Sequence, residues 1–162
     1  MTKKTIAYIG LGSNLSMPKK QVSDAALAVA NIADSQLFAL SSLYLSKPMG
    51  PQDQDDYINA VIAIETELSA MALLDALQAI ENAAGRERKD NRWGARILDC
   101  DLLLYGNEVI DNERLTVPHY GMKVREFVLL PLVEIAPNLK LPDGSAVTTL
   151  AKNISDNGII KL

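Results

Sequence analysis

Cysteine is almost absent from this chain of 162 residues, which contains only Cys100. A single cysteine excludes a disulfide within the chain, so we expect a reducing, cytoplasmic location. Long apolar runs are absent too, since no stretch approaches the roughly 20 apolar residues of a membrane-spanning helix. Positive net charge is also lacking, because the formal net charge is −4. Nucleic-acid-binding domains are usually basic overall, so we expect neither a nucleic-acid partner nor a membrane partner.

The composition is that of an ordinary globular protein, with 48% hydrophobic and 22% charged residues. The length suffices for one domain with a sizeable core, and we expect a single domain over residues 1–162 that acts as a monomer. The apolar run at residues 5–11 is too short for a signal peptide and lacks a small-residue cleavage site, so it predicts a first strand. The turn after this strand lacks the Gly-x-x-x-x-Gly-Lys-Ser/Thr pattern, which excludes a P-loop.

Apolar periodicity predicts the main elements of the first two thirds of the chain. They are strands over residues 5–11, 36–45, 57–65 and 97–105, and helices over residues 18–31 and 69–84. Ser69 is expected to cap the second helix and Gly85 to end it. The order β-α-β-β-α-β is the split βαβ, ferredoxin-like pattern. We therefore expect an α+β fold, with a largely antiparallel sheet and helices packed on it.

The last third of the chain predicts shorter elements. They are a strand over residues 108–110, a helical turn over 122–126, a helix over 127–135 with Pro131 near its start, an edge strand over 139–141 and a helix over 147–153. Two long polar loops, 46–56 and 86–96, separate the earlier elements. Long loops in compact domains are usually functional, and we expect both to close over bound ligands.

The strand predicted at residues 97–105 is apolar except for Asp99 and Asp101. Successive side chains of a strand point to opposite faces, so the two aspartates share one face while Cys100 lies on the other. Two adjacent carboxylates repel each other, and a divalent cation relieves that repulsion. Magnesium is usually held by one or two carboxylates together with substrate phosphates. The pair therefore indicates a magnesium site, although an Asp-x-Asp on the wet face of a sheet gives the same pattern.

The loop at residues 86–96 carries five basic and two acidic side chains, a local charge of +3 in an acidic protein. Guanidinium forks match phosphate oxygens, and so short a basic segment suits a small anion better than a long polyanion. Gln78 and Glu81 lie near the end of the preceding helix, close to this loop. A basic loop is often only soluble surface, but next to the aspartate pair it indicates one site for Mg²⁺ and a polyphosphate.

Three other residues each allow two interpretations. Asn59, on an otherwise apolar strand, is either a satisfied core amide or a ligand donor. His119, the only histidine, is either a turn histidine or a phosphate contact. Its polar segment also contains Arg114, Thr116, Tyr120 and Arg125. Trp93 either packs on the domain or stacks on a flat ligand, and its polar loop favours the ligand.

Several motifs follow one another along nearly the whole chain. They are Ala7-Tyr8-Ile9-Gly10-Leu11-Gly12-Ser13-Asn14-Leu15, Gly50-Pro51-Gln52-Asp53-Gln54, Asp56-Tyr57-Ile58-Asn59-Ala60, Arg92-Trp93-Gly94-Ala95-Arg96 with Asp99-x-Asp101, Leu115-Thr116-Val117-Pro118-His119-Tyr120, and Leu130-Pro131-Leu132-Val133-Glu134-Ile135-Ala136-Pro137. With these motifs the chain resembles the 6-hydroxymethyl-7,8-dihydropterin pyrophosphokinases of the folate pathway. Two departures are visible: Cys100 replaces a usually aliphatic residue, and Lys47 precedes Pro48 in the first loop.

The resemblance implies transfer of the pyrophosphoryl group of ATP to the hydroxymethyl oxygen of the pterin, with release of AMP. It also implies two Mg²⁺ ions on Asp99 and Asp101, and assistance to the transfer by Arg86 and Arg96. The implied nucleotide contacts are Gln78, Glu81, Arg88, Lys89, Arg96, Leu102, Arg114, Thr116, His119, Tyr120 and Arg125. The implied pterin contacts are Ser46, Met49, Tyr57, Asn59, Trp93 and Phe127, with aromatic faces above and below the ring.

Two other functional classes use the same kinds of residue. One is a different transferase, either a simple kinase or a nucleotidyltransferase. The other is a nucleotide-binding module without catalysis. The intact aspartate pair and the intact arginines argue against the module.

Overall fold

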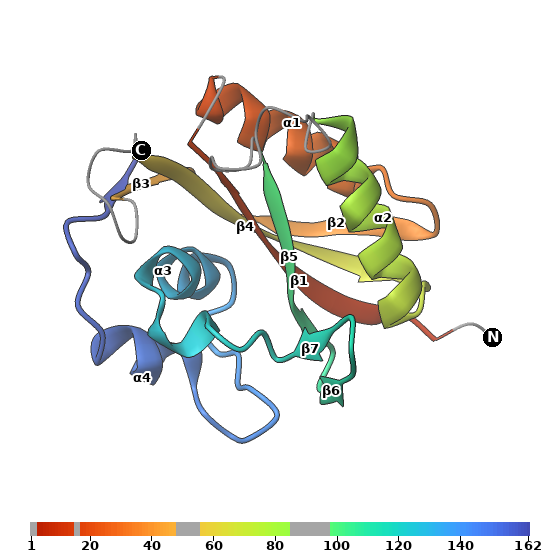
Figure 1. The fold of residues 1–162 in the computed structure, drawn as a ribbon. Coiled ribbons are helices and arrows are strands. Elements are labelled where there is room, and N and C mark those ends of the chain that lie inside the picture. Colours follow the sequence, from red (N-terminus) through yellow and green to blue (C-terminus); the bar gives the residue numbers. More distant parts are fainter. Residues whose placement is uncertain (1–2, 15–16, 48–55, 85–97) are drawn as a thin grey trace.

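The computed structural model describes residues 3–14, 17–47, 56–84 and 98–162, and six of the strands among them form one antiparallel sheet (Figure 1). Strand β1 (Thr5–Ser13) lies inside the sheet between β4 (Tyr57–Thr66) and β5 (Asp99–Tyr105). Strands β2 (Ser35–Leu40) and β3 (Tyr44–Ser46) both pair with β4, and β8 (Ile160–Lys161) extends the sheet from β3. This arrangement confirms the α+β fold expected from the split βαβ pattern.

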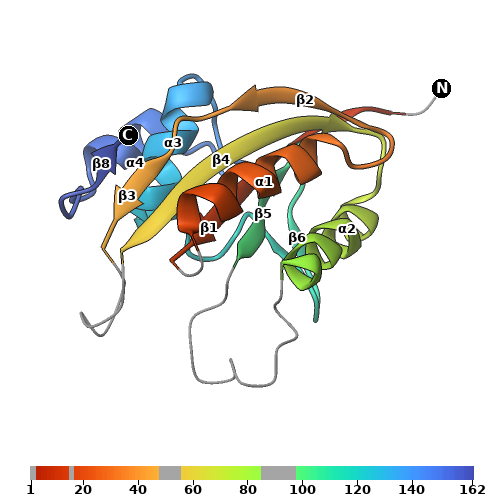
Figure 2. The same ribbon diagram turned by 90° about the horizontal axis from the view of Figure 1, so that it is seen from above.

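Helices cover both faces of this sheet (Figures 1 and 2). Helices α1 (Pro18–Ala30) and α2 (Ala70–Ala83) lie on one face, where Ile9, Leu73 and Leu77 are fully buried. Helices α3 (Glu126–Ile135) and α4 (Val147–Lys152) lie on the other face, over a second core cluster that includes Val61 and Leu132. Because β1 and β4 are covered on both sides, their sequences are nearly continuous apolar runs.

The helix boundaries follow local signals in the sequence. Pro18 occupies the first turn of α1, where its missing N–H would have had no helical partner. The Ser69 side chain caps α2 by accepting a hydrogen bond of 3.1 Å from the backbone N–H of Ala72. Among the described residues no helix is long and apolar enough to cross a membrane.

The structure corrects four details of the predicted elements. The strand expected over residues 36–45 is two strands, because the regular pairing with β4 stops after Leu40 and resumes at Tyr44. Pro131 lies in the middle of α3 rather than near its start. The strand expected at 108–110 is β6 (Ile110–Asp111), which pairs with β7 (Thr116–Val117). The edge strand expected at 139–141 is a single bridge from Lys140. A short 3₁₀ helix, η2 (Met122–Val124), occupies the predicted helical turn.

Candidate active site

The aspartate pair lies at the start of β5 with the geometry that alternation predicts. Asp99 and Asp101 are partly exposed on one face, while Cys100 is buried in the core beneath α1 and α2. Gly12 of β1 pairs with Asp99, and Gly10 pairs with Asp101. Each carboxylate therefore stands across from a residue without a side chain, which leaves open space on that face.

One residue of β5 lies outside the regular pairing with β1. Leu102 pairs with Ile9 and Leu104 pairs with Tyr8, so Leu103 is the extra residue of a β-bulge. The Leu103 side chain lies beside Gly10, where a Cβ atom would come within 3.5 Å of its methyl groups. Leu103 thus covers the apolar side of the space in front of the aspartates.

That space is a cavity of about 180 Å³. The described residues that line it are Gly10, Leu11, Gly12, Ser46, Lys47, Tyr57, Asn59, Ala60, Asp99, Asp101, Leu103, Arg125, Phe127 and Val128. All of the predicted pterin contacts that the structure describes are among them. The cavity therefore joins the predicted pterin site to the aspartate pair.

Asn59 and Ser46 form a buried polar contact in the cavity wall. The Asn59 side-chain amide donates a hydrogen bond of 2.7 Å to Ser46 Oγ, and both residues are buried. A Cβ atom at Gly12 would lie only 3.2 Å from Asn59 Oδ1, so a glycine at this position makes room for the amide. Burial, together with the charge of Asp99, raises the pKa of the neighbouring Tyr57, which stays a neutral phenol.

His119 faces the aspartate pair from the segment after β7. Its Nε2 atom lies 3.9 Å from Asp101 Oδ2, and its Nδ1 atom accepts a hydrogen bond from the backbone N–H of Gly121. Burial lowers the pKa of His119, and the charge of Arg125 adds to this effect while Asp101 opposes it. The ring is therefore neutral at pH 7, with the Nε2 proton directed toward Asp101.

Arg125 connects the histidine segment to the cavity. Its guanidinium lies 5.6 Å from the ring centre of Tyr120 and 5.8 Å from that of Phe127. Tyr120 in turn stacks on His119, with the ring centres 4.7 Å apart, and is 79% exposed. Tyr120 therefore contacts both His119 and Arg125, and its side chain remains largely exposed.

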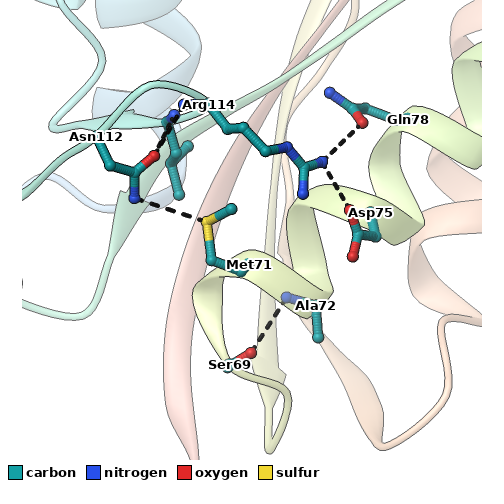
Figure 3. Close-up of polar contacts among 8 residues, drawn as sticks. Ser69, Met71, Ala72, Asp75, Gln78, Asn112 and Arg114 are labelled. Atoms are coloured by element: carbon teal, nitrogen blue, oxygen red, sulfur yellow. Dashed lines mark hydrogen bonds and ion pairs between the residues drawn. The ribbon is translucent and has the colours of Figure 1, made fainter.

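Two predicted nucleotide contacts meet on helix α2 (Figure 3). Arg114, between β6 and β7, donates hydrogen bonds of 2.7 Å to Asp75 and 3.0 Å to Gln78. Glu81, one turn further along α2, is buried and accepts a hydrogen bond of 2.8 Å from the backbone N–H of Cys100. Glu81 therefore fixes the backbone between the two aspartates.

The structure places the remaining predicted residues away from the cavity or does not describe them. Thr116 is exposed on β7, and the Leu102 side chain is buried in the core beneath α1 and α2. Six predicted site residues lie outside the described residues, as do the central parts of the two loops expected to close: Met49, Arg86, Arg88, Lys89, Trp93 and Arg96.

Some residues that line the cavity were not predicted as site residues, namely the glycines opposite the aspartates, Leu103 and Val128. The Gly-x-Gly inside a strand was the available signal, since glycine in a strand often marks close approach of a ligand.

Comparisons with known proteins show the family of this chain. Residues 8–137 match the family model described as 7,8-dihydro-6-hydroxymethylpterin-pyrophosphokinase (HPPK). The chain belongs to the HPPK family. It is 56% identical over 156 residues to the 2-amino-4-hydroxy-6-hydroxymethyldihydropteridine pyrophosphokinase of Haemophilus influenzae, covering 96% of this chain and 97% of the relative. The corresponding protein of Pseudomonas aeruginosa is 48% identical over 155 residues, which cover 96% of this chain and 95% of that relative.

Solved structures of HPPK-DHPS from Plasmodium falciparum share the fold. One of them, a triple mutant with SDX-DHP, superposes with a TM-score of 0.76 at 16% sequence identity. It covers 93% of this chain, which spans 44% of the longer Plasmodium chain. As a member of the HPPK family, the enzyme transfers pyrophosphate from ATP to the hydroxymethyl group of 6-hydroxymethyl-7,8-dihydropterin, releasing AMP, in folate biosynthesis.

Proposed function

We propose that Asp99 and Asp101 hold two Mg²⁺ ions against the phosphates of ATP, and that the cavity beside them binds the pterin. The observation that carries this proposal is the shared cavity, in which Ser46, Asn59 and Phe127 line the same space as both aspartates. A ligand placed among these side chains has its reacting group next to the metal-binding carboxylates.

The residues present fit magnesium. Two carboxylates supply hard oxygen ligands, and the Asp101 side chain is 43% exposed. Among the described residues no group of three His, Cys, Asp or Glu side chains could hold a metal alone. Phosphate oxygens and water would complete the coordination, as is usual for magnesium. Bound there, the ions would neutralise phosphate charge and stabilise the attacking and leaving oxygens of the transfer.

The reaction forms one bond and breaks one. The hydroxymethyl oxygen of the pterin attacks the β-phosphorus of ATP, the bond from that phosphorus to the α,β-bridging oxygen breaks, and AMP leaves with that oxygen. The hydroxyl proton is lost to solvent or to an acceptor on the substrates. Phosphoryl transfer needs little covalent help from side chains, so positioning and charge stabilisation dominate. Asn59 and Ser46 would orient the pterin, while Phe127 would supply an aromatic face.

We assign the nucleotide to the surface residues of α2 and of the segment after β7. Arg114 and Gln78 already contact each other there, and the exposed ring of Tyr120 lies beside His119. We propose that three basic residues contact the phosphates of ATP: Arg88, Lys89 and Arg125. We propose that Arg86 and Arg96 stabilise the transferring group, because guanidinium groups match the charge that develops on the phosphate. We also retain the expectation of a cytoplasmic, single-domain enzyme.

A product analysis tests the reaction and the metal together. The protein is incubated with ATP, Mg²⁺ and 6-hydroxymethyl-7,8-dihydropterin, and the nucleotide product is identified. AMP without free pyrophosphate supports the proposal, whereas ADP indicates a simple kinase and free pyrophosphate indicates nucleotidyl transfer. Removal of the metal with a chelator should abolish AMP formation, and added Mg²⁺ should restore it. Turnover that persists in excess chelator would contradict the metal assignment.

A further inference from the structure

The carboxylate of Glu134, near the end of α3, binds the segment that precedes and begins β3. Its Oε1 atom accepts hydrogen bonds of 3.0 Å from the backbone N–H of Ser42 and 2.8 Å from the hydroxyl of Tyr44. Its Oε2 atom accepts from the Ser42 hydroxyl at 2.8 Å and lies 3.8 Å from the ammonium of Lys161. We call these four residues the Glu134 network.

Several donors converge on this one carboxylate, whose side chain is 25% exposed. Burial raises the pKa of Glu134, but hydrogen bonds from Ser42 and Tyr44 and the charge of Lys161 outweigh burial, so the net pKa is lowered. The group is therefore fully ionised at neutral pH, and charge-assisted hydrogen bonds are roughly twice as strong as neutral ones.

The Glu134 network joins two elements that both contribute residues to the cavity wall. Helix α3 contributes Phe127 and Val128, and β3 contributes Ser46, which accepts the hydrogen bond from Asn59. Strand β3 has only three residues and follows the break in pairing after Leu40. Three residue pairs with β4 and two with β8 hold this strand in the sheet, and Figure 2 shows it beside α3. The network supplies direct side-chain hydrogen bonds from α3 to this segment.

We propose that Glu134 is a positioning residue for the pterin, which sets the separation of α3 from β3 and thereby the width of the cavity between Phe127 and Ser46. The inference rests on the pterin-binding role proposed above for this cavity. Glu134 does not line the cavity itself, since it lies seven residues beyond Phe127, roughly 10 Å along the helix. It acts through these two elements and makes no contact with the reacting atoms, so its loss should weaken pterin binding more than ATP binding.

The test compares Glu134→Gln and Tyr44→Phe with wild type. Glutamine has nearly the size of glutamate but presents an NH₂ group to the donors of Ser42 and Tyr44. Tyr44→Phe removes the single hydrogen bond from the Tyr44 hydroxyl to Glu134. We expect the KM for the pterin to rise about tenfold in Glu134→Gln, because displacement of a supporting element by a fraction of an ångström is costly. It should rise less in Tyr44→Phe, and the KM for ATP should stay within about twofold of wild type in both.

Tyr105→Phe is the matched control, because it removes a tyrosine hydrogen bond to the backbone of Leu68, far from α3 and β3. It should lower the melting temperature without changing either KM. Wild-type pterin KM in both test variants, or an equal rise in both KM values, would overturn the inference. If Glu134→Gln fails to fold, Tyr44→Phe and Ser42→Ala decide it.

A further variant separates failure of this inference from failure of the proposed site. Asn59→Leu removes a polar group from the cavity wall, so it should weaken pterin binding if the pterin occupies the cavity. Normal pterin binding by Asn59→Leu would contradict the site itself. Weak binding by Asn59→Leu together with normal binding by the Glu134 and Tyr44 variants would contradict only the positioning role.

Discussion

Gly121 lies directly beneath the guanidinium of Arg125. A Cβ atom added at residue 121 would lie 2.7 Å from Arg125 Nε and 2.8 Å from Arg125 Cζ. The backbone of Gly121 has φ of −102°, which any residue can adopt, so only the contact with Arg125 opposes a side chain here. The absence of a side chain at position 121 therefore determines where the Arg125 guanidinium lies between Tyr120 and Phe127.

Gly121→Ala should move Arg125 without unfolding the protein. Because the displaced group is the end of a flexible side chain, the free energy of unfolding should change by only about 1 kcal/mol or less. The value of kcat/KM should fall about tenfold, equivalent to about 1.4 kcal/mol, because Arg125 is a proposed phosphate contact. Thermal unfolding and steady-state kinetics measure the two effects separately.

A double-mutant cycle with Arg125→Ala checks that Arg125 transmits the effect. Once Arg125 is absent, Gly121→Ala should cost little further activity. Additive losses in the double variant would show that the glycine matters for another reason, such as its hydrogen bond to His119 Nδ1.

Asp99→Ala and Asp101→Ala should each remove most of the activity and leave the fold intact. Both side chains are partly exposed in the cavity, so neither is required for core packing. Loss of about 3–5 kcal/mol of transition-state stabilisation corresponds to roughly a hundred- to several-thousand-fold in rate. The kcat value and the melting temperature are measured for each variant, and near-normal turnover of Asp99→Ala would rule out its role as a metal ligand.

Cys100→Val should be nearly silent in activity. The thiol is buried in the core beneath α1 and α2, on the face of β5 opposite the aspartates. Burial raises the pKa of this thiol, and the charges of Glu81 and both aspartates raise it further, so it remains protonated. A swap of similar size and polarity usually costs less than about 1.5 kcal/mol. A large loss of rate at unchanged stability would be incompatible with this placement.

The contribution of Glu134 to stability should depend on pH in one direction. Its pKa is lowered in the folded protein from the ordinary value of 4.5, so folding favours the ionised form. The resulting stabilisation is fully present above pH 4.5 and is lost as the pH falls through the folded-state pKa. Denaturant unfolding of wild type and Glu134→Gln at pH 7 to 3 measures it. The stability difference should be constant near neutrality and shrink in acid, and a difference independent of pH would contradict the assignment.

Local patterns were sufficient to predict the strand that carries the aspartate pair. Alternation in residues 97–105 predicted that Asp99 and Asp101 share a face and that Cys100 is buried, and the structure confirms both. The Ser69 cap was also correct, because a capping side chain bonds within its own first turn. Such features depend on neighbours within a few residues, which a sequence displays directly.

Features that depend on distant residues were not predicted. The break between β2 and β3 is occupied by Ser41, whose backbone and hydroxyl both bond to Val61, and by Ser42, which bonds to Glu134. Helix α3 continues through Pro131 because its apolar residues are buried against the sheet, an effect of packing that outweighs the local preference of proline. No local pattern encodes these contacts.

The bulge at Leu103 has a consequence for how β5 tolerates insertions and deletions. Loss of one residue from a strand ordinarily turns every side chain beyond it to the opposite face. Here Leu102 and Leu104 already pair with the adjacent residues Ile9 and Tyr8 of β1, so removal of Leu103 would restore regular alternation. The aspartates would still face the cavity, and Tyr105 would still face the core beneath α2. A chain shorter by one residue at this position would thus keep the aspartate pair facing the cavity and lose only the leucine that lies beside Gly10.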